Sequence, residues 1–133
     1  IKYFKLEKKI ELLNYKKKLY YYYKSSSLYV CPSIYESFGL TVAEAISLNL
    51  PVIAFKNCPG VNELIKHKKN GILVDSYYYD FNSLANEMIK LVNDKRLVER
   101  IQKCSKEDLL VKNTKPKVLN EWNKLIKNIN AVN

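Results

Sequence analysis

Hydrophobic positions along the chain alternate between short apolar runs and longer stretches with helical spacing. Three runs predict buried β-strands, at residues 27–31, 51–55 and 71–74, and residues 1–5 are compatible with a short fourth strand. The run at 51–55 shows no alternation with polar residues. A strand of this kind is typical of a parallel sheet that is covered on both faces.

Helical spacing of apolar residues appears between and after these runs. It predicts helices at residues 15–24, 40–48, 61–67, 81–92, 96–103 and 118–129. The Asn and Gly at positions 70 and 71 favour a C-cap after the helix at 61–67. The last helix follows Pro116 and has one apolar stripe, so we expect it to pack on the core with Trp122 buried. Its stripe consists of Leu119, Trp122, Leu125, Ile126 and Ile129.

The order of these elements predicts the fold class. Strands that alternate with helices and are followed by further helices indicate an α/β fold with a parallel sheet and flanking helices. Such sheets bind ligands beyond the carboxyl ends of their strands. We therefore expect functional residues in the loops that follow Cys31 and Phe55.

Length and composition exclude several classes of protein. A chain of 133 residues with 47% hydrophobic residues builds one domain with a core, and it has no apolar run near the roughly 20 residues needed to span a bilayer. Three widely spaced cysteines and a single histidine, His67, are a poor set of zinc ligands. Unpaired thiols and the lack of a leader-like apolar segment favour the cytoplasm. Because the sequence has no initial Met, we expect it to be a piece of a longer protein.

The net charge of +10 comes almost entirely from lysine. A basic surface suits nucleic acid, an anionic membrane or a phosphorylated small molecule, so the charge alone does not identify the partner. Lysines 16–18 and tyrosines 20–23 form an aromatic and basic cluster that could contact lipid headgroups or stack on bases. The interpretation that we favour is a helix with half-buried tyrosines and lysines that reach out to solvent.

Residues 32–45, which read PSIYESFGLTVAEA, hold the candidate site. Gly39 stands at the predicted start of a helix, where unpaired backbone N–H groups and a partial positive charge suit a phosphate or diphosphate. Glu36 lies in the loop before it and Glu44 about one turn inside the helix. Carboxylates accept hydrogen bonds from vicinal hydroxyls, so one could hold a sugar ring and the other a ribose. This arrangement suits a nucleotide sugar.

These residues resemble the donor-binding half of retaining glycosyltransferases with the GT-B fold, group 1 (family 4). Glu36 and Glu44 match the family's E-x7-E motif. The resemblance continues through residues 49–54 (NLPVIA), 60–65 (GVNELI) and 70–74 (NGILV), as far as about Arg100. It implies a Rossmann-like parallel sheet with flanking helices, the C-terminal half of a GT-B enzyme.

The resemblance also implies residue roles. Glu36 would contact the donor sugar and help to stabilise charge at the anomeric carbon, which makes it the candidate catalytic residue. Glu44 would bind the ribose hydroxyls. Backbone amides of the intervening loop and helix start, with the Thr41 hydroxyl, would bind the sugar and diphosphate; these residues are Ser37, Phe38, Gly39, Leu40 and Thr41. Taken without the motif, Ser37 could instead be only an N-cap and Phe38 only a packing residue.

The implied reaction is transfer of a sugar to a hydroxyl of a glycan or glycolipid with retention of configuration. The expected donor is a UDP-sugar, with GDP- and ADP-sugars as alternatives. No metal or other cofactor is expected, and the sequence has no Asp-x-Asp pair. We expect no nucleic-acid partner, a cytoplasmic location, and a basic face that suits the anionic inner surface of a membrane.

The resemblance further implies what the chain lacks. Residues 1–133 would form a single, partial nucleotide-sugar-binding domain, without the N-terminal acceptor domain and without the start of the donor domain, which normally supplies a basic pair for the diphosphate. We therefore expect the chain alone to be inactive in transfer. Two alternatives remain: a basic α/β module that binds nucleic acid, and a degenerate relative without catalytic activity.

Overall fold

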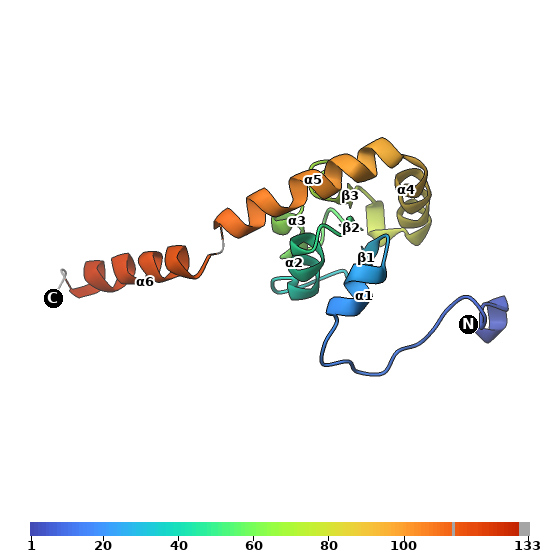
Figure 1. Cartoon of the computed structure of the whole chain (residues 1–133), viewed down its shortest axis with the longest axis horizontal. Coiled ribbons are helices and arrows are strands. Elements are labelled where there is room, and N and C mark those ends of the chain that lie inside the picture. Colours follow the sequence, from blue (N-terminus) through green and yellow to red (C-terminus); the bar gives the residue numbers. More distant parts are fainter. Residues whose placement is uncertain (113, 131–133) are drawn as a thin grey trace.

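The computed structural model describes residues 1–112 and 114–130 and contains a parallel three-stranded sheet (Figure 1). Its strands are β1 (Tyr29–Cys31), β2 (Val52–Phe55) and β3 (Ile72–Val74), in the order β1-β2-β3. Cys31 is opposite Ala54, and Phe55 is opposite Val74. Every residue of β2 is buried, because this strand has a neighbour on each side and helices on both faces. The predicted parallel sheet is confirmed.

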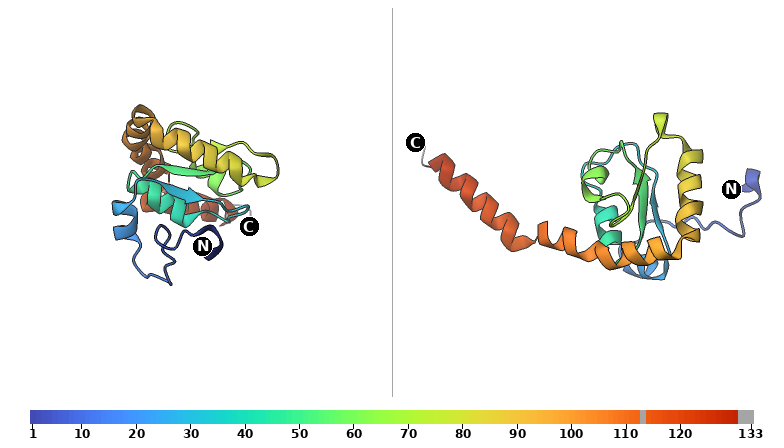
Figure 2. Two further views of the ribbon diagram at one scale, coloured as in Figure 1. Left: turned by 90° about the vertical axis from the view of Figure 1, so that its right-hand side faces the viewer. Right: turned by 90° about the horizontal axis from the view of Figure 1, so that it is seen from above.

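Helices cover both faces of the sheet (Figure 2). On one face lie α2 (Leu40–Ser47) and α3 (Val61–Leu64), and on the other lies α4 (Phe81–Asn93). A longer helix, α5 (Lys95–Lys112), packs against both α2 and α4 and contributes the fully buried Ile101. The core is mainly aliphatic with Phe55 among it, and its largest fully buried side chains include Phe55, Ile46, Ile53, Leu91 and Ile101.

The N-terminal segment differs from the prediction. Residues 2–4 form a short 3₁₀ helix, η1 (Lys2–Phe4), rather than a strand, and the segment lies apart from the sheet (Figure 1). A strand needs a partner for its backbone groups, whereas here the Lys5 N–H donates to the Lys2 carbonyl oxygen at 3.0 Å. The next helix, α1 (Tyr20–Ser25), is also shorter than the predicted helix at 15–24.

Helix α3 ends three residues earlier than predicted because of a buried side chain. The Asn70 amide donates to the Leu64 carbonyl oxygen at 3.0 Å, and its oxygen accepts the Lys66 N–H at 2.7 Å. These bonds replace further helical ones, so Ile65 is already extended. The predicted C-cap is therefore wrong: Asn70 organises a loop. His67 lies in this loop, and its Nδ1 accepts the Leu73 N–H at 3.1 Å.

The last helix, α6 (Lys115–Asn130), includes Pro116 in its first turn, where a proline ring is tolerated. It projects away from the rest of the chain (Figure 1), and it has no buried residue. The side chain of Trp122 is 59% exposed, so the prediction that it belongs to the core is wrong. Hydrophobic periodicity identifies an apolar face but does not show what covers that face. A short 3₁₀ turn, η2 (Tyr77–Tyr79), leads into α4.

Candidate functional site

Helix α2 begins at a left-handed glycine, where the sequence placed the phosphate-binding turn. Gly39 has φ 78° and ψ 51°, a conformation that a side chain disfavours. A Cβ at this position would also lie 3.1 Å from the Val61 Cγ2 of α3. Within the part of the chain that the structure describes, no side chain caps this helix, so Ser37 is not an N-cap. The first backbone N–H groups of α2 are thus available to a ligand.

The loop after β2 lies directly on the loop after β1. Gly60 has φ 78°, and a Cβ there would overlap the Glu36 carbonyl oxygen and lie 3.0 Å from the carbonyl carbon of Ser37. The two loops that follow β1 and β2 therefore meet at the carboxyl ends of their strands, as the topology predicts. In the sequence Gly60 stood out only as the first residue of the matching segment 60–65, and the structure adds this close backbone contact.

The first candidate carboxylate, Glu36, is half-buried in the loop between β1 and α2. Its Oε1 accepts a hydrogen bond from the Ser33 hydroxyl at 2.8 Å. Ser33 follows Pro32, which ends β1, so a strand terminus fixes the donor. Ser33 lies within the same motif as Glu36, although nothing in the sequence pattern singled it out as a partner of that carboxylate.

The second candidate carboxylate, Glu44, lies in the second turn of α2 and is exposed. Its Oε2 accepts a hydrogen bond from the Tyr23 hydroxyl of α1 at 3.1 Å. Tyr23 is only 7% exposed. Burial, together with the hydrogen bond to Glu44, raises the pKa of Tyr23 well above its usual value, so the phenol is a neutral donor.

A second tyrosine reaches the same helix. The Tyr29 hydroxyl of β1 donates to Thr41 Oγ1 at 2.8 Å, and burial raises the pKa of Tyr29 as well. The rings of Tyr23 and Tyr29 are 5.8 Å apart and meet edge to face. The sequence grouped Tyr23 with the aromatic and basic cluster. Nothing in the local sequence pattern indicated that Tyr23 contacts Glu44, 21 positions away, or that Tyr29 contacts Thr41, 12 positions away.

The other candidate residues lie at the surface of this turn. The side chains of Phe38 and Leu40 are 45% and 68% exposed, and that of Ser37 is exposed too. Phe38 is therefore not a core residue. The exposed turn lies between Glu36 and Glu44 in the sequence, and each of these carboxylates is held by a residue outside the turn, Ser33 or Tyr23.

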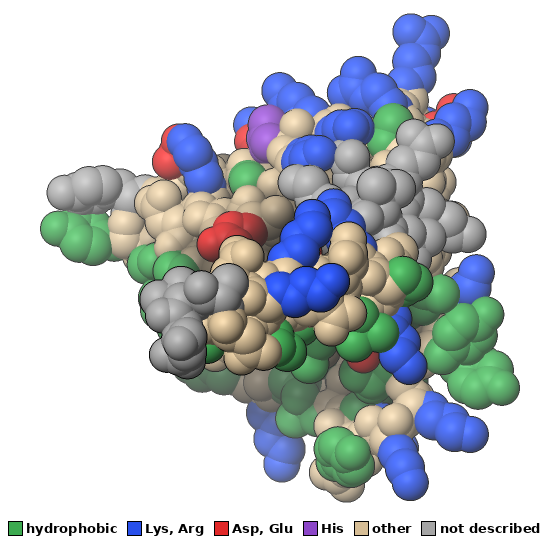
Figure 3. Space-filling view, turned by 90° about the vertical axis from the view of Figure 1, so that its left-hand side faces the viewer, with side chains coloured by type: hydrophobic (Ala, Val, Ile, Leu, Met, Phe, Trp, Pro, Cys, Tyr) green, Lys and Arg blue, Asp and Glu red, His purple; other side chains and the backbone are tan. Residues whose placement is uncertain are grey.

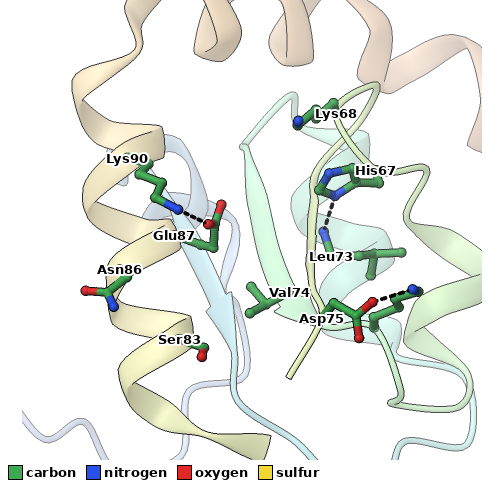
Figure 4. Close-up of a pocket in the computed structure, with 10 residues that line it drawn as sticks. His67, Lys68, Leu73, Val74, Asp75, Ser83, Asn86, Glu87 and Lys90 are labelled. Atoms are coloured by element: carbon green, nitrogen blue, oxygen red, sulfur yellow. Dashed lines mark hydrogen bonds and ion pairs between the residues drawn. The ribbon is translucent and has the colours of Figure 1, made fainter. Parts of the chain in front are cut away.

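One cavity borders a predicted site residue, and a larger cavity lies apart from all of the predicted site residues. One of about 480 Å³ borders Glu44 and is walled mainly by α1 and the end of α2, including Leu19, Tyr20, Tyr23 and Leu48. A larger one of about 530 Å³ lies between β3 and α4 (Figure 4). Its charged side chains are largely paired, since Lys56 contacts Asp75 at 2.6 Å and Lys90 contacts Glu87 at 2.5 Å.

The described residues also limit which other sites can be assigned. Within residues 1–112 and 114–130, no three His, Cys, Asp or Glu side chains lie together as a metal-binding group. In the same residues no helix is both long and apolar enough to span a membrane. Lysine and arginine side chains spread over the face seen in Figure 3, between few carboxylates.

Comparison with known proteins assigns the family. The sequence profile described as "Glycosyl transferases group 1" matches residues 1–108. The chain belongs to this family. An uncharacterized glycosyltransferase of Haemophilus influenzae is 36% identical over 109 residues, which cover 77% of this chain and 28% of that protein.

A second relative extends the match along the chain. It is the UDP-Gal:alpha-D-GlcNAc-diphosphoundecaprenol alpha-1,3-galactosyltransferase of Escherichia coli, 28% identical over 127 residues that cover 96% of this chain and 29% of the enzyme. This group 1 glycosyltransferase chain therefore spans less than a third of the length of these relatives.

Among solved structures, Anabaena HepE in complex with UDP-glucose superimposes with a TM-score of 0.80 at 21% identity, over 92% of this chain and 33% of HepE. This likeness establishes a common fold. The parallel sheet with helices on both faces is thus the Rossmann-like α/β arrangement of GT-B glycosyltransferases, as the resemblance implied.

Proposed function

We propose that this chain supplies the donor-binding part of a glycosyltransferase, which transfers a sugar from a nucleotide sugar to a hydroxyl of a glycan or lipid-linked acceptor with retention of configuration. The supporting observation is the turn at Gly39, which presents uncapped backbone N–H groups between Glu36 and Glu44. A diphosphate is the ligand that such a helix terminus attracts. A carboxylate on each side suits the hydroxyls of a sugar and a ribose.

Each residue then has a distinct role. Backbone amides of residues 37–41 bind the diphosphate and sugar, and the Thr41 hydroxyl adds a donor. Glu44 accepts hydrogen bonds from the ribose hydroxyls. Glu36 contacts the donor sugar and stabilises charge that develops at the anomeric carbon. The positive end of the helix dipole offsets part of the charge on the leaving diphosphate, and the proposed reaction uses no metal ion.

Two relatives support the choice of ligand. HepE was solved with UDP-glucose, and the Escherichia coli relative is named for a UDP-galactose donor and a diphosphoundecaprenol-linked acceptor. We therefore propose a UDP-sugar first, with GDP- and ADP-sugars as alternatives, and a membrane-linked or polysaccharide acceptor. Because the chain spans only 28% of the Haemophilus influenzae relative and 29% of the Escherichia coli relative, we expect it to bind the donor and not to catalyse transfer alone.

The test is a calorimetric titration of the chain with UDP, GDP, ADP and their glucose conjugates. We expect one nucleotide series to bind, and Glu44→Gln and Glu36→Gln to weaken it. Glu44→Gln should affect nucleotide and nucleotide sugar alike, whereas Glu36→Gln should affect only the sugar conjugate. Glu99→Gln on the exposed surface of α5 is the control. Binding that is unchanged in both variants, or binding to nucleic acid in place of nucleotides, would overturn the proposal.

We also propose that the protein works at the cytoplasmic face of a membrane. The supporting observation is the surface of α6, which exposes one apolar stripe that includes Trp122, Leu125 and Ile126. The same helix has four lysines, Lys115, Lys117, Lys124 and Lys127, against the single acid Glu121. An apolar stripe with a tryptophan and a lysine-rich opposite face is typical of helices that lie in the interface of an anionic bilayer.

A further inference from the structure

Two tyrosines outside the Gly39 turn hold side chains that project from α2. Tyr23 donates to Glu44 Oε2 at 3.1 Å, and Tyr29 donates to Thr41 Oγ1 at 2.8 Å. Thr41 and Glu44 are three residues apart, so they share one face of the helix. Since the two tyrosine rings also contact each other, they form a single unit, which we call the tyrosine pair.

The hydrogen bond at Glu44 joins a buried group to an exposed one. Tyr23 is 7% exposed, whereas Glu44 is exposed, so the phenol approaches the carboxylate from the protein side. A carboxylate offers about four lone-pair sites, and Tyr23 uses one of them. The bond thus restricts a long, flexible side chain and leaves acceptor capacity for a pair of hydroxyls.

The hydrogen bond at Thr41 leaves the proton of the threonine hydroxyl available for donation to a ligand. A threonine hydroxyl has one donor and two acceptor sites. Because Thr41 Oγ1 accepts from Tyr29, its own O–H remains available as a donor. An O–H donor in the first turn of α2 lies where the helix terminus attracts an anion. The tyrosine pair therefore sets one side chain as an acceptor and the other as a donor.

On this basis we propose that Tyr23 and Tyr29 are positioning residues for nucleotide binding. Tyr23 holds the Glu44 carboxylate in the orientation in which it accepts hydrogen bonds from the two ribose hydroxyls. Tyr29 holds the Thr41 hydroxyl so that this hydroxyl donates a hydrogen bond to the diphosphate. The inference rests on the proposed function, and it assigns roles to two residues that lie outside the E-x7-E segment.

The experiment compares a nucleotide with an analogue that lacks the hydroxyls. Whichever of UDP, GDP and ADP binds the chain is titrated beside its 2′,3′-dideoxy form. We expect Tyr23→Phe to weaken the parent nucleotide by about five- to tenfold and to leave the dideoxy form within about twofold of wild type. Tyr22→Phe is the matched control, because Tyr22 lies on the same helix and is 38% exposed.

Two further comparisons separate positioning from a general loss of structure. In a double-mutant cycle, Tyr23→Phe and Glu44→Gln should be strongly non-additive, because both remove the same contact. Tyr29→Phe should weaken the diphosphate and its dideoxy form equally, and should leave the free nucleoside unaffected. Equal weakening of parent and dideoxy forms by Tyr23→Phe would show a merely structural role and overturn the inference.

The outcomes distinguish this inference from the proposed function. If none of the three diphosphates binds, the proposed function fails and the role of the tyrosine pair fails with it. If one binds and depends on Glu44 but Tyr23→Phe matches the Tyr22→Phe control, only the inference about the tyrosine pair is wrong.

Discussion

Gly60 packs its α-carbon against the backbone of Glu36, and a Cβ at position 60 would overlap the Glu36 carbonyl oxygen. Gly60 also has φ 78°, which a side chain disfavours. The loop after β2 is therefore a rigid support for the loop that holds the first candidate carboxylate. Any change at position 60 acts on Glu36 through the backbone.

We predict that Gly60→Ala disturbs both stability and nucleotide binding. Strain at a left-handed residue costs about 1–3 kcal/mol, and the overlap forces the loop of residues 32–38 to move. Chemical denaturation measures the first effect, and calorimetry on the folded protein measures the second.

The control for this prediction is Gly71→Ala. A Cβ at position 71 would lie 2.8 Å from the Val52 carbonyl oxygen, within the sheet and away from the Glu36 loop. It should reduce stability and leave nucleotide affinity intact. If both variants changed affinity equally, the support of Glu36 by Gly60 would be wrong.

A second prediction concerns the buried Asn70, which is 1% exposed and hydrogen-bonds the backbone at Leu64 and Lys66. Asn70→Ala leaves one buried carbonyl and one N–H without this partner. We expect the free energy of unfolding to fall by about 2–4 kcal/mol, because each unsatisfied buried group costs about 1–3 kcal/mol. Urea denaturation measures the change. The exposed Asn62→Ala on α3 should have little effect, and a similarly small effect for Asn70→Ala would contradict the prediction.

The local part of this architecture was predictable from the sequence. The apolar run that became β2 and the placement of Glu36, Gly39 and Glu44 depend on residues close together in the chain, where periodicity and turn chemistry act. The partners of the carboxylates were not predictable. Tyr23 and Glu44 are 21 residues apart, and only the tertiary fold brings them within hydrogen-bonding distance.

Two wrong predictions, the length of α3 and the burial of Trp122, have related physical causes. The helix at α3 ended early because a side chain six residues beyond Leu64 captured its carbonyl group. Trp122 was expected in the core because the apolar stripe of α6 has the correct period, although period contains no information about the surface that the stripe meets. Tertiary partners therefore decided what local patterns left open.

A third prediction concerns pH. Asp80 caps the N-terminus of α4, and hydrogen bonds from the Ser83 hydroxyl and from the backbone N–H groups of Asn82 and Ser83 lower the pKa of Asp80. Because the folded pKa lies below the unfolded one, the cap stabilises fully above the unfolded pKa. Its contribution is lost as the pH falls through the folded pKa.

The variant that isolates this contribution is Asp80→Asn, since asparagine also caps helices but does not titrate in this range. We expect the melting temperature of wild type to fall more than that of Asp80→Asn below about pH 4. Melting curves recorded between pH 7 and pH 3 measure the difference. Glu121→Gln on α6 serves as a control for the loss of one carboxylate, and parallel curves for all three proteins would contradict the prediction.

The last prediction concerns α6 and the membrane. We expect the chain to sediment with vesicles of anionic phosphatidylglycerol and not with neutral phosphatidylcholine, because four lysines contribute about 1 kcal/mol each near an anionic surface. Added salt should weaken the association, since it screens these charges. Trp122→Ser with Ile126→Ser should abolish it by removing the apolar contact.

The matched control is Ile89→Ser on α4, a residue of similar exposure that lies outside the stripe. This control should sediment like wild type. Another outcome is that wild type is a dimer, that the α6 variant is a monomer, and that neither protein binds vesicles. The apolar stripe would then belong to a protein–protein contact. In that case the lysines of α6 would only keep the helix soluble, and the proposal of a membrane location would be wrong.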